Sequence, residues 1–362
     1  MTAVAGSPLQ RLHALGQSIW LDYVQRGMIA SGELKRLMAA DAVTGVTSNP
    51  SIFEKAIDES TEYDEAIAGA SRPPAAIFED LAVADIGAAA DVLRPAYDAA
   101  DGGDGFVSIE VSPTLAEDTE GTIAEATRLW RRLNRPNVMI KVPSTAAGCA
   151  AVRRLIADGI NVNITLMFSL QHYDAVADAY MSGLEVRAGQ GKPLTPLASV
   201  ASFFVSRVDA KVDPKVPEAL RGKVAVANAR AAYARFRTTF SGPRWEALAR
   251  RGARLQRPLW ASTSTKNPAY SDVLYVDELA GPDTVNTMPP ATMEAYRAHG
   301  QPADRLGGDF QDVMGALPGL GIDLTQVGEE LQHEGVRAFA ESYAKVLSSI
   351  EKKRQALVGG RP

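Results

Sequence analysis

Polar side chains interrupt neighbouring apolar segments in the first half of the chain. The segments Val107–Ser112 and Asn161–Leu166 alternate apolar and polar residues, and the segment Val138–Pro143 carries Lys141 among apolar neighbours. Side chains of a β-strand alternate between its two faces, so these segments predict strands with one apolar face and one polar face. Barrel strands are normally apolar on both faces, so a polar face indicates a site inside the barrel.

Lys141 and Glu110 are suited to carbonyl chemistry if both lie on that inner face. A lysine kept away from water favours its neutral amine, which is the form that attacks a carbonyl carbon and makes an imine. We expect Glu110, Lys141 and Thr165 near the C-terminal ends of adjacent strands, where barrel enzymes have their active sites. The structural alternatives are a lysine that reaches solvent, a glutamate that only pairs with it, and Asn163 and Thr165 as hydrogen-bonded core residues.

Asp22 adds a second carboxylate to an apolar segment. It lies within Ser18–Val24, which otherwise predicts a buried strand. An acid in such a strand indicates a catalytic or binding group. The alternative is an N-cap for the following helix.

Short apolar segments alternate along the chain with segments of helical spacing. Eight strands are predicted: Ile19–Val24, Gly45–Ser48, Phe106–Val111, Val138–Val142, Val162–Leu166, Val200–Phe204, Pro258–Ser262 and Thr284–Thr287. Strand and helix in repeated alternation predict an α/β fold, and eight repeats favour a single (β/α)8 TIM barrel over an open doubly wound sheet. We expect one domain over residues 1–362, with additional helices around 208–256 and 325–357.

Composition excludes several classes of protein. The 362 residues carry a formal net charge of −5, and 46% of them are hydrophobic, as in ordinary globular proteins. This charge gives no reason to expect nucleic acid or a membrane as a partner, and no apolar run reaches the roughly 20 residues of a membrane span. The single cysteine, Cys149, fits a reducing, cytoplasmic location, and it leaves a redox role of that thiol open.

Four segments resemble motifs of the transaldolase family. Thr47–Ser51 resembles T-x-N-P-S, Ile140–Thr145 resembles I-K-x-x-S-T, Asn163–Ser169 resembles N-x-T-L-x-F-S, and Ser202–Arg207 resembles S-x-F-V-x-R. The resemblance extends in order over roughly residues 18 to 270. It implies the transfer of a dihydroxyacetone unit from sedoheptulose 7-phosphate to glyceraldehyde 3-phosphate, giving erythrose 4-phosphate and fructose 6-phosphate. This is a step of the pentose phosphate pathway.

The resemblance also implies roles for residues at the matching positions. Lys141 would form the Schiff base, Glu110 would act as general acid and base through a water that Thr165 helps to hold, and Asp22 would handle the proton of the substrate hydroxyl. The implied substrate-binding residues are Asn49, Ser202, Phe204, Arg207, Ser264 and Lys266. No metal and no organic cofactor are implied, and relatives occur as monomers and as homodimers.

The segment Ala261–Pro268 departs from the better-known family pattern. Lys266 stands where that pattern has a second phosphate-binding arginine, and a lysine binds phosphate without the two-pronged geometry of arginine. The matching serine is either Ser264 or Ser262. The chain is also longer between the sixth and seventh strands, which indicates a larger subgroup.

Two other functions remain open at this point. A related aldolase would cleave fructose 6-phosphate without transferring its carbons; Glu110 and the length of the chain favour a transaldolase. A catalytically inactive barrel that binds sugar phosphates would be free to lose one of the four candidate catalytic residues, and this chain retains all of them.

Overall fold

The computed structural model describes residues 6–359, and the predicted domain limits at residues 1 and 362 lie outside them. Eight parallel strands pair in sequence order and close into a barrel, which confirms the TIM-barrel prediction and excludes the open sheet. The strands are β1 Gln17–Leu21, β2 Val43–Val46, β3 Val107–Glu110, β4 Val138–Pro143, β5 Val162–Met167, β6 Ser199–Phe204, β7 Arg257–Ala261 and β8 Thr284–Met288.

The first two strands were predicted too far along the chain. β1 ends at Leu21, so Asp22 lies just beyond the strand, and β2 ends at Val46. The apolar run continues to Val24 because that side chain is fully buried although it belongs to a loop. Burial of a loop residue produces the same hydrophobic signal as burial of a strand residue, so the pattern alone extended the strand.

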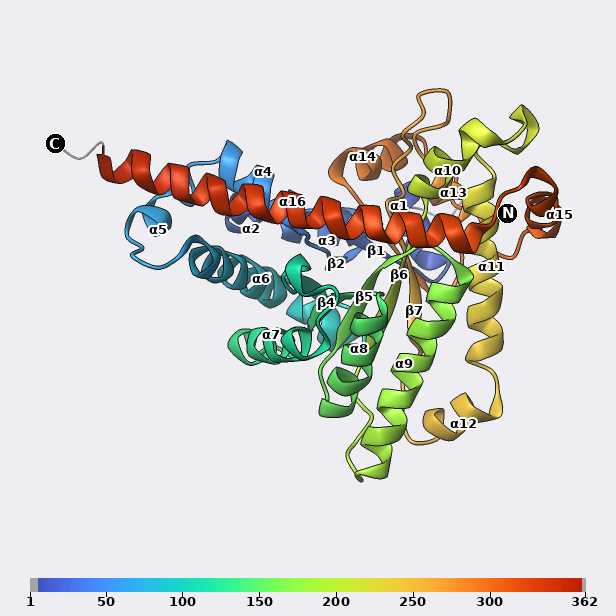
Figure 1. The fold of residues 1–362 in the computed structure, drawn as a ribbon, viewed down its shortest axis with the longest axis horizontal. Coiled ribbons are helices and arrows are strands. Elements are labelled where there is room, and N and C mark those ends of the chain that lie inside the picture. The colour runs from blue at the N-terminus through green and yellow to red at the C-terminus, as the bar shows by residue number, and fades with distance from the viewer. Residues whose placement is uncertain (1–5, 360–362) are drawn as a thin grey trace.

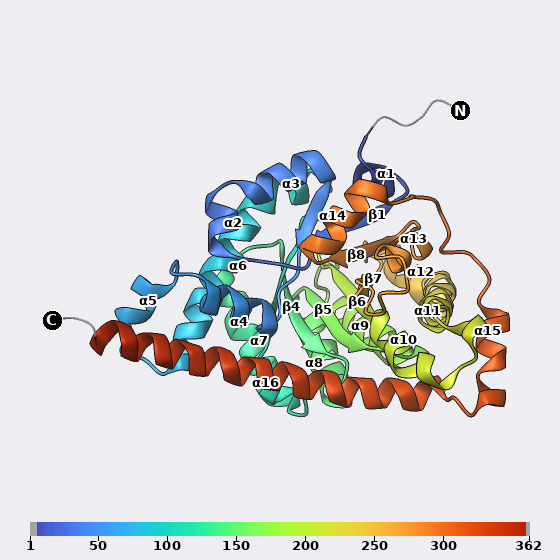
Figure 2. The ribbon, with the colours of Figure 1, turned by 90° about the horizontal axis from the view of Figure 1, so that it is seen from above.

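Helices surround the barrel and cover its outer face (Figures 1 and 2). Up to β6 they are α1 Pro8–Ala14, α2 Arg26–Ala30, α3 Glu33–Asp41, α4 Pro50–Glu59, α5 Asp64–Ala68, α6 Pro74–Ala99, α7 Thr119–Leu133, α8 Ala146–Asp158 and α9 Leu170–Gly189, with the 3-10 turn η1 Pro113–Leu115. After β7 come α13 Leu274–Glu278, α14 Pro290–His299 and α15 Gln311–Ala316, followed by η4 Pro318–Leu320. No helix within residues 6–359 has both the length and the apolar character to cross a membrane.

The connection between β6 and β7 contains α10 Ser206–Val212, η2 Asp213–Lys215, η3 Glu218–Leu220, α11 Val224–Thr239 and α12 Pro243–Ala249. Asp209 of α10 joins this connection to α13 beyond β7, because its carboxylate accepts hydrogen bonds from the backbone of Ala225 in α11 at 2.7 Å and from the hydroxyl of Tyr275 in α13 at 2.9 Å. Burial raises the pKa of Asp209 to about 6. These helices enlarge the barrel wall beside β6 and β7.

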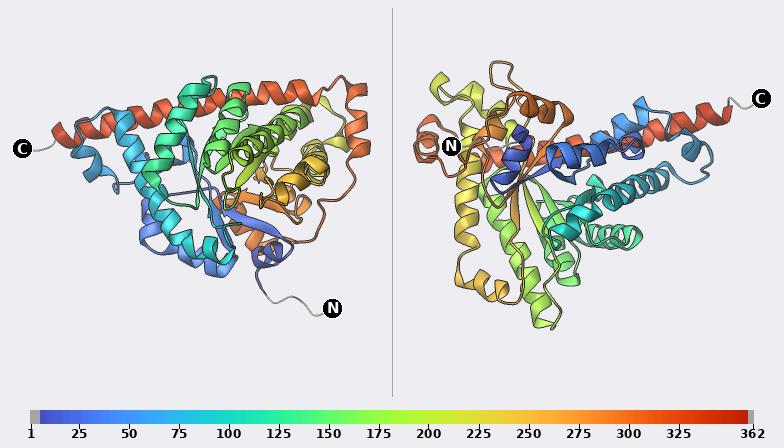
Figure 3. Two further views of the ribbon diagram at one scale, coloured as in Figure 1. Left: turned by 90° about the horizontal axis from the view of Figure 1, so that it is seen from below. Right: turned by 180° about the vertical axis from the view of Figure 1, so that it is seen from behind.

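The last helix, α16 Leu324–Gly359, is long enough to pass the whole barrel and continue beyond it (Figure 3). It packs along the C-terminal ends of the strands on the β5 side and then against α4, α5 and α6. Val346 and Ile350 are fully buried there in a small apolar cluster with Ile57 and Tyr63. Burial of each such aliphatic side chain contributes about 1.5–3 kcal/mol, so the far half of α16 is firmly held.

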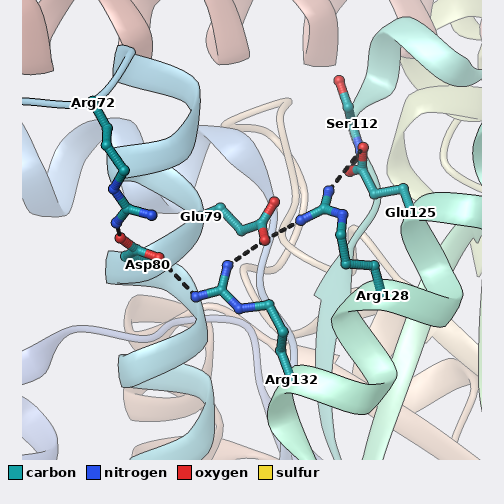
Figure 4. Close-up of polar contacts among 7 residues, drawn as sticks. All are labelled: Arg72, Glu79, Asp80, Ser112, Glu125, Arg128 and Arg132. Atoms are coloured by element: carbon teal, nitrogen blue, oxygen red, sulfur yellow. Dashed lines mark hydrogen bonds and ion pairs between the residues drawn. The ribbon is translucent and has the colours of Figure 1, made fainter.

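An ion-pair network on the outside of the barrel supports the segment that follows β3 (Figure 4). Glu79 of α6 accepts hydrogen bonds from Arg128 and Arg132 of α7. Glu125 of α7 accepts a hydrogen bond of 2.7 Å from the backbone of Ser112, two residues after Glu110. The network therefore joins α6 and α7 to the chain immediately beyond the candidate catalytic glutamate.

The N-terminal end of the barrel is closed by a buried polar cluster around Asp104. This carboxylate accepts hydrogen bonds from the hydroxyl of Ser18, the indole of Trp20 at 2.9 Å and the hydroxyl of Thr44 at 2.8 Å. Arg257 lies 3.7 Å away and also donates to Ser18. Each oxygen of the buried acid is thus paired, which is the normal state of a structural polar group.

Candidate active site

Lys141 and Glu110 lie side by side inside the barrel. The two residues are direct partners in the pairing of β3 with β4. The Nζ atom of Lys141 lies 3.8 Å from Oε2 of Glu110, and each side chain is only 6% exposed. Nζ also donates a hydrogen bond of 3.3 Å to the carbonyl of Ser48. The lysine is therefore held inside the barrel and does not extend to the protein surface, so that structural alternative is wrong.

Glu110 is poised to change its protonation state near neutral pH. Burial raises the pKa of this carboxyl to about 7, against the opposing effect of Lys141, while Asp22 raises it further. Its Oε2 atom has no hydrogen-bond partner among the residues of the described chain. A carboxyl with this pKa and a free oxygen is able to give and to take a proton, which a structural acid such as Asp104 is not arranged to do.

Asp22 faces the same pocket from the end of β1. Its Oδ1 atom accepts a hydrogen bond of 2.6 Å from Thr47, whose hydroxyl also contacts that of Thr287 at 2.7 Å. Burial raises the pKa of Asp22, and Lys141 and the bond from Thr47 oppose that rise. The N-cap of the following helix is Gln25, so the alternative role of Asp22 as a helix cap is wrong.

The polar residues of β5 fall into two kinds. The amide of Asn163 donates to Ser108 at 3.0 Å and accepts a hydrogen bond of 2.6 Å from Ser202, so this residue is a satisfied core group. The hydroxyl of Thr165 is fully buried and has no partner within the described chain. A buried hydroxyl without a protein partner normally binds an ordered water or a ligand.

Three polar residues of the motifs also cap helices. Asn49 is the N-cap of α4, and its Oδ1 atom accepts from the backbone of Ile52 at 3.1 Å. Thr145 and Ser169 cap α8 and α9 in the same way. Such a cap contributes about 1 kcal/mol. In Asn49 the cap uses the oxygen, so the amide NH₂ is the part that remains for a substrate.

Two cations, Arg207 and Lys266, line the same pocket after β6 and β7. The guanidinium of Arg207 lies 5.4 Å from the ring centre of Phe204, and burial lowers the pKa of Arg207. The pKa of Lys266 is also lowered, first by burial and then by Arg207. Within residues 6–359 no carboxylate lies within 4.0 Å of either cation. Glu334 partly offsets the effect of burial on the pKa of Arg207, and Asp22 that on the pKa of Lys266. Two cations without a close carboxylate in one pocket wall form a candidate anion site.

The two candidate serines at this end differ in their contacts. The hydroxyl of Ser264 accepts a hydrogen bond of 2.9 Å from Lys266. The hydroxyl of Ser262 contacts that of Ser206 at 3.0 Å, and Ser262 has a left-handed backbone with φ of 56°. Both residues line the pocket, but Ser264 is the one attached to a cation.

These walls enclose one open pocket of about 1420 Å³, including space that opens to solvent. Its lining contains most of the predicted site residues: Asp22, Asn49, Lys141, Ser202, Phe204, Arg207, Ser264 and Lys266. Glu110 is the strand partner of Lys141 and lines an adjoining pocket with Ser48 and Asn49, and Thr165 lies on β5, the strand on the other side of β4. The pocket has room for a phosphorylated sugar between an amine at the bottom and two cations at the side.

Sequence reasoning missed several residues of the pocket wall. Thr47, directly after β2, and Thr287 in β8 were not singled out, although a threonine in or next to a barrel strand is the same signal that identified Thr165. Phe339 was missed altogether: its ring centre lies 5.9 Å from Nζ of Lys141. Phe339 belongs to α16, almost 200 residues away in sequence, and an aromatic residue in an amphipathic helix gives no sign of a catalytic neighbour.

Fold and site together define a (β/α)8-barrel enzyme whose pocket combines a buried amine, two carboxyl groups and an anion site. The model of the transaldolase/fructose-6-phosphate aldolase family matches residues 19–350. The chain belongs to this family, as its resemblance to transaldolase motifs indicated.

Proteins named as transaldolases are similar in sequence to this chain over almost its whole length. The chain is 46% identical to transaldolase 2 of Nostoc sp. (strain PCC 7120), with 96% of this chain and 98% of the relative covered. It is 48% identical to a transaldolase of Parafrankia sp., over 96% of this chain and 98% of the other. It is 47% identical to a transaldolase of Thermobifida fusca, over 97% and 99%. These relatives show that it is an enzyme of the transaldolase type.

Proposed function

We propose that this enzyme transfers a dihydroxyacetone unit from sedoheptulose 7-phosphate to glyceraldehyde 3-phosphate through an imine on Lys141. The observation that carries this proposal is the buried pair of Lys141 and Glu110, 3.8 Å apart at the bottom of a pocket with an anion site. A protonated imine accepts the electrons of a breaking carbon–carbon bond, and the pocket supplies the proton carriers beside it.

The first steps use the amine and the glutamate. The neutral amine of Lys141 attacks the C2 carbonyl of the ketose, and a proton moves from the nitrogen to the carbonyl oxygen to give a carbinolamine. Glu110, through a water held by Thr165, donates a proton to the C2 hydroxyl, which leaves as water and gives the protonated imine. The pKa of Glu110 near 7 suits a group that must be protonated here and take a proton back later.

Cleavage and transfer then use Asp22. Its carboxylate takes the proton of the C4 hydroxyl, the C3–C4 bond breaks, and its electron pair moves into the imine to give an enamine while erythrose 4-phosphate leaves. The enamine attacks the aldehyde of glyceraldehyde 3-phosphate, and Asp22 returns a proton to the new hydroxyl. Hydrolysis of the imine releases fructose 6-phosphate and restores Lys141.

The remaining residues hold the two ends of the substrate. Asn49, through its free NH₂ group, and Ser202 bind the hydroxyls of the dihydroxyacetone part, and Phe204 forms the wall beside them. Arg207 binds the phosphate with its planar fork, and Lys266 with Ser264 contributes a point charge and a hydroxyl. We place the enzyme in the cytoplasm, as a monomer or a homodimer that acts on phosphorylated sugars.

Borohydride reduction in the presence of fructose 6-phosphate tests the chemistry. We expect mass spectrometry to find one three-carbon adduct, located on Lys141. An adduct on another lysine, or no adduct, contradicts the mechanism. Without an acceptor aldehyde, free dihydroxyacetone should appear far more slowly than the transfer product does with acceptor; release at the full rate would instead identify a fructose 6-phosphate aldolase.

A further inference from the structure

The C-terminal helix reaches the catalytic strands through one buried polar residue. Gln332 of α16 is only 5% exposed, although glutamine is usually a surface residue. Its Nε2 atom donates a hydrogen bond of 2.8 Å to the hydroxyl of Ser144 and one of 3.3 Å to the carbonyl of Leu166. Ser144 directly follows β4 and Leu166 lies in β5; in sequence they are 188 and 166 residues from Gln332.

Both acceptors adjoin residues of the proposed mechanism. Ser144 follows β4 three residues after Lys141, and its backbone N–H donates to the carbonyl of Thr165 at 2.8 Å. Leu166 is the residue next to Thr165 in β5. The hydroxyl of Ser144 also donates to the carbonyl of Leu166 at 2.9 Å. Gln332 therefore completes a triangle of hydrogen bonds with Ser144 and Leu166. Ser144 lies three residues after Lys141, and Leu166 lies next to Thr165.

Leu166 has a backbone that needs such support. Its φ is 61°, in the left-handed region that residues other than glycine rarely occupy, and the pairing of β5 with β6 shifts register between Ile164 and Met167. Residues with such backbone angles persist only where their surroundings hold them, and they concentrate at active sites. A bulge directly after Thr165 changes the direction of the strand at that hydroxyl.

Two further residues of α16 contact the same edge of the barrel. Gly335 lies so close that an added Cβ would come within 2.8 Å of the side chain of Leu166, and Phe339 lies over the amine of Lys141. Gln332, Gly335 and Phe339 are spaced by three and four residues, so they share one face of the helix. On this face Gln332 donates hydrogen bonds to the catalytic strands, Gly335 allows close approach because it has no side chain, and Phe339 contributes an aromatic ring.

We propose that Gln332 is a positioning residue: it holds the bulge at Leu166, and through it the hydroxyl of Thr165, in the geometry that proton transfer between Glu110 and the substrate requires. This inference rests on the proposed function and adds a residue of the C-terminal helix to it. Gln332 touches no substrate, so it affects the rate of the proton steps and not the affinity for sugar phosphates.

The replacement Gln332→Leu removes both hydrogen bonds and retains approximately the volume of the side chain. We expect kcat to fall by about 10-fold or more, because small displacements of catalytic groups have large effects on rate, with KM within about twofold of the original. The matched control is Gln326→Leu on the same helix, whose amide only contacts Glu330 at the surface; its kinetics should not change. Thermal unfolding of both variants is measured in parallel.

The replacement Gln332→Glu gives a signature that a merely structural residue would not produce. A protonated carboxyl group donates a hydrogen bond to the Leu166 carbonyl, whereas a carboxylate only accepts. The ratio of kcat in this variant to kcat in the unmodified enzyme should therefore rise as the pH is lowered from about 8 to about 5.5. This measurement also serves if Gln332→Leu does not fold.

Three results would overturn the inference: an unchanged kcat in folded Gln332→Leu, a raised KM with kcat intact, or a pH-independent ratio for Gln332→Glu. All assume that the unmodified enzyme forms the borohydride-trapped adduct on Lys141. If the unmodified enzyme gives no adduct, the proposed function itself has failed, and the two failures are thus told apart.

Discussion

The two ends of the barrel each bury a carboxyl group, and they treat it in opposite ways. At the N-terminal end Asp104 accepts hydrogen bonds from Ser18, Trp20 and Thr44 and has Arg257 at 3.7 Å. At the C-terminal end one oxygen of Glu110 has no hydrogen-bond partner in the described chain, and burial raises the pKa of that group to about 7. The first end is built for stability and the second for reaction.

The difference shows how one barrel combines a rigid base with a reactive mouth. The fully paired carboxylate of Asp104 at the base stabilises the strands without chemical consequence. Unpaired ones at the mouth are unfavourable in the empty enzyme, but they are the groups that a substrate and ordered water would satisfy. Substitutions at the mouth should therefore change rate more than stability, and substitutions at the base the reverse.

The largest effect is expected from Lys141→Ala. Without the amine no imine forms, and turnover should fall by roughly 10³-fold or more. Folding should survive, because the pKa of Glu110 rises further without Lys141 and the buried carboxyl is then neutral. The assay is paired with thermal unfolding and with Lys192→Ala, an exposed lysine after α9, as control. Turnover near the normal rate would show that Lys141 is not the nucleophile and that this end of the barrel is not the reactive one.

Glu110→Gln should lower turnover by roughly 100-fold, the usual scale for a lost acid–base group. In the unmodified enzyme kcat/KM should fall as the pH rises through about 7, because the protonated carboxyl that donates to the leaving hydroxyl disappears. The variant should lack this limb of the pH–rate profile. If its rate and profile match the original, the glutamate is only the structural partner of Lys141.

Asp104→Asn tests the other end of the barrel. The substitution removes a charged acceptor from a buried network, and the free energy of unfolding should decrease by about 2–4 kcal/mol in denaturant titrations. Turnover per folded molecule should stay within about twofold of the original. Asp91→Asn is the control, since its ion pair with Arg135 is exposed and should contribute less than about 1 kcal/mol. A loss of turnover without loss of stability would remove the distinction between the two ends.

The smallest effect is expected from Lys266→Ala at the rim of the mouth. Loss of this cation should raise KM for phosphorylated sugars by about 10-fold and lower kcat less, because Arg207 and the chemistry remain. Lys266→Arg should restore most of the affinity. Equal changes for phosphorylated and unphosphorylated sugars would take Lys266 out of the anion site.

Much of the fold was predictable because its signals are local. Short apolar segments separated by helical ones predict a parallel barrel, and the alternation of side chains along a strand places Ser108, Glu110, Asn163 and Thr165 on one face. The end of β1 was misplaced because a buried loop residue, Val24, resembles a strand residue in sequence. The distinction between Ser262 and Ser264 could not be made, because it depends on which hydroxyl lies beside Lys266.

The sequence by itself determined the alternation of strands and helices that favours a barrel, the polar faces that carry Lys141 and Glu110, and the resemblance to the family, since each follows from residue type and short-range spacing. Only the tertiary structure decided which buried polar groups are satisfied. Asn163 and Thr165 have the same pattern in sequence, yet both the amide nitrogen and the oxygen of Asn163 are hydrogen-bonded, whereas the hydroxyl of Thr165 has no partner within residues 6–359. It also decided that α16 brings Gln332 and Phe339 to the catalytic strands, because the contacts of a helix with residues so distant in sequence depend on how the whole chain packs.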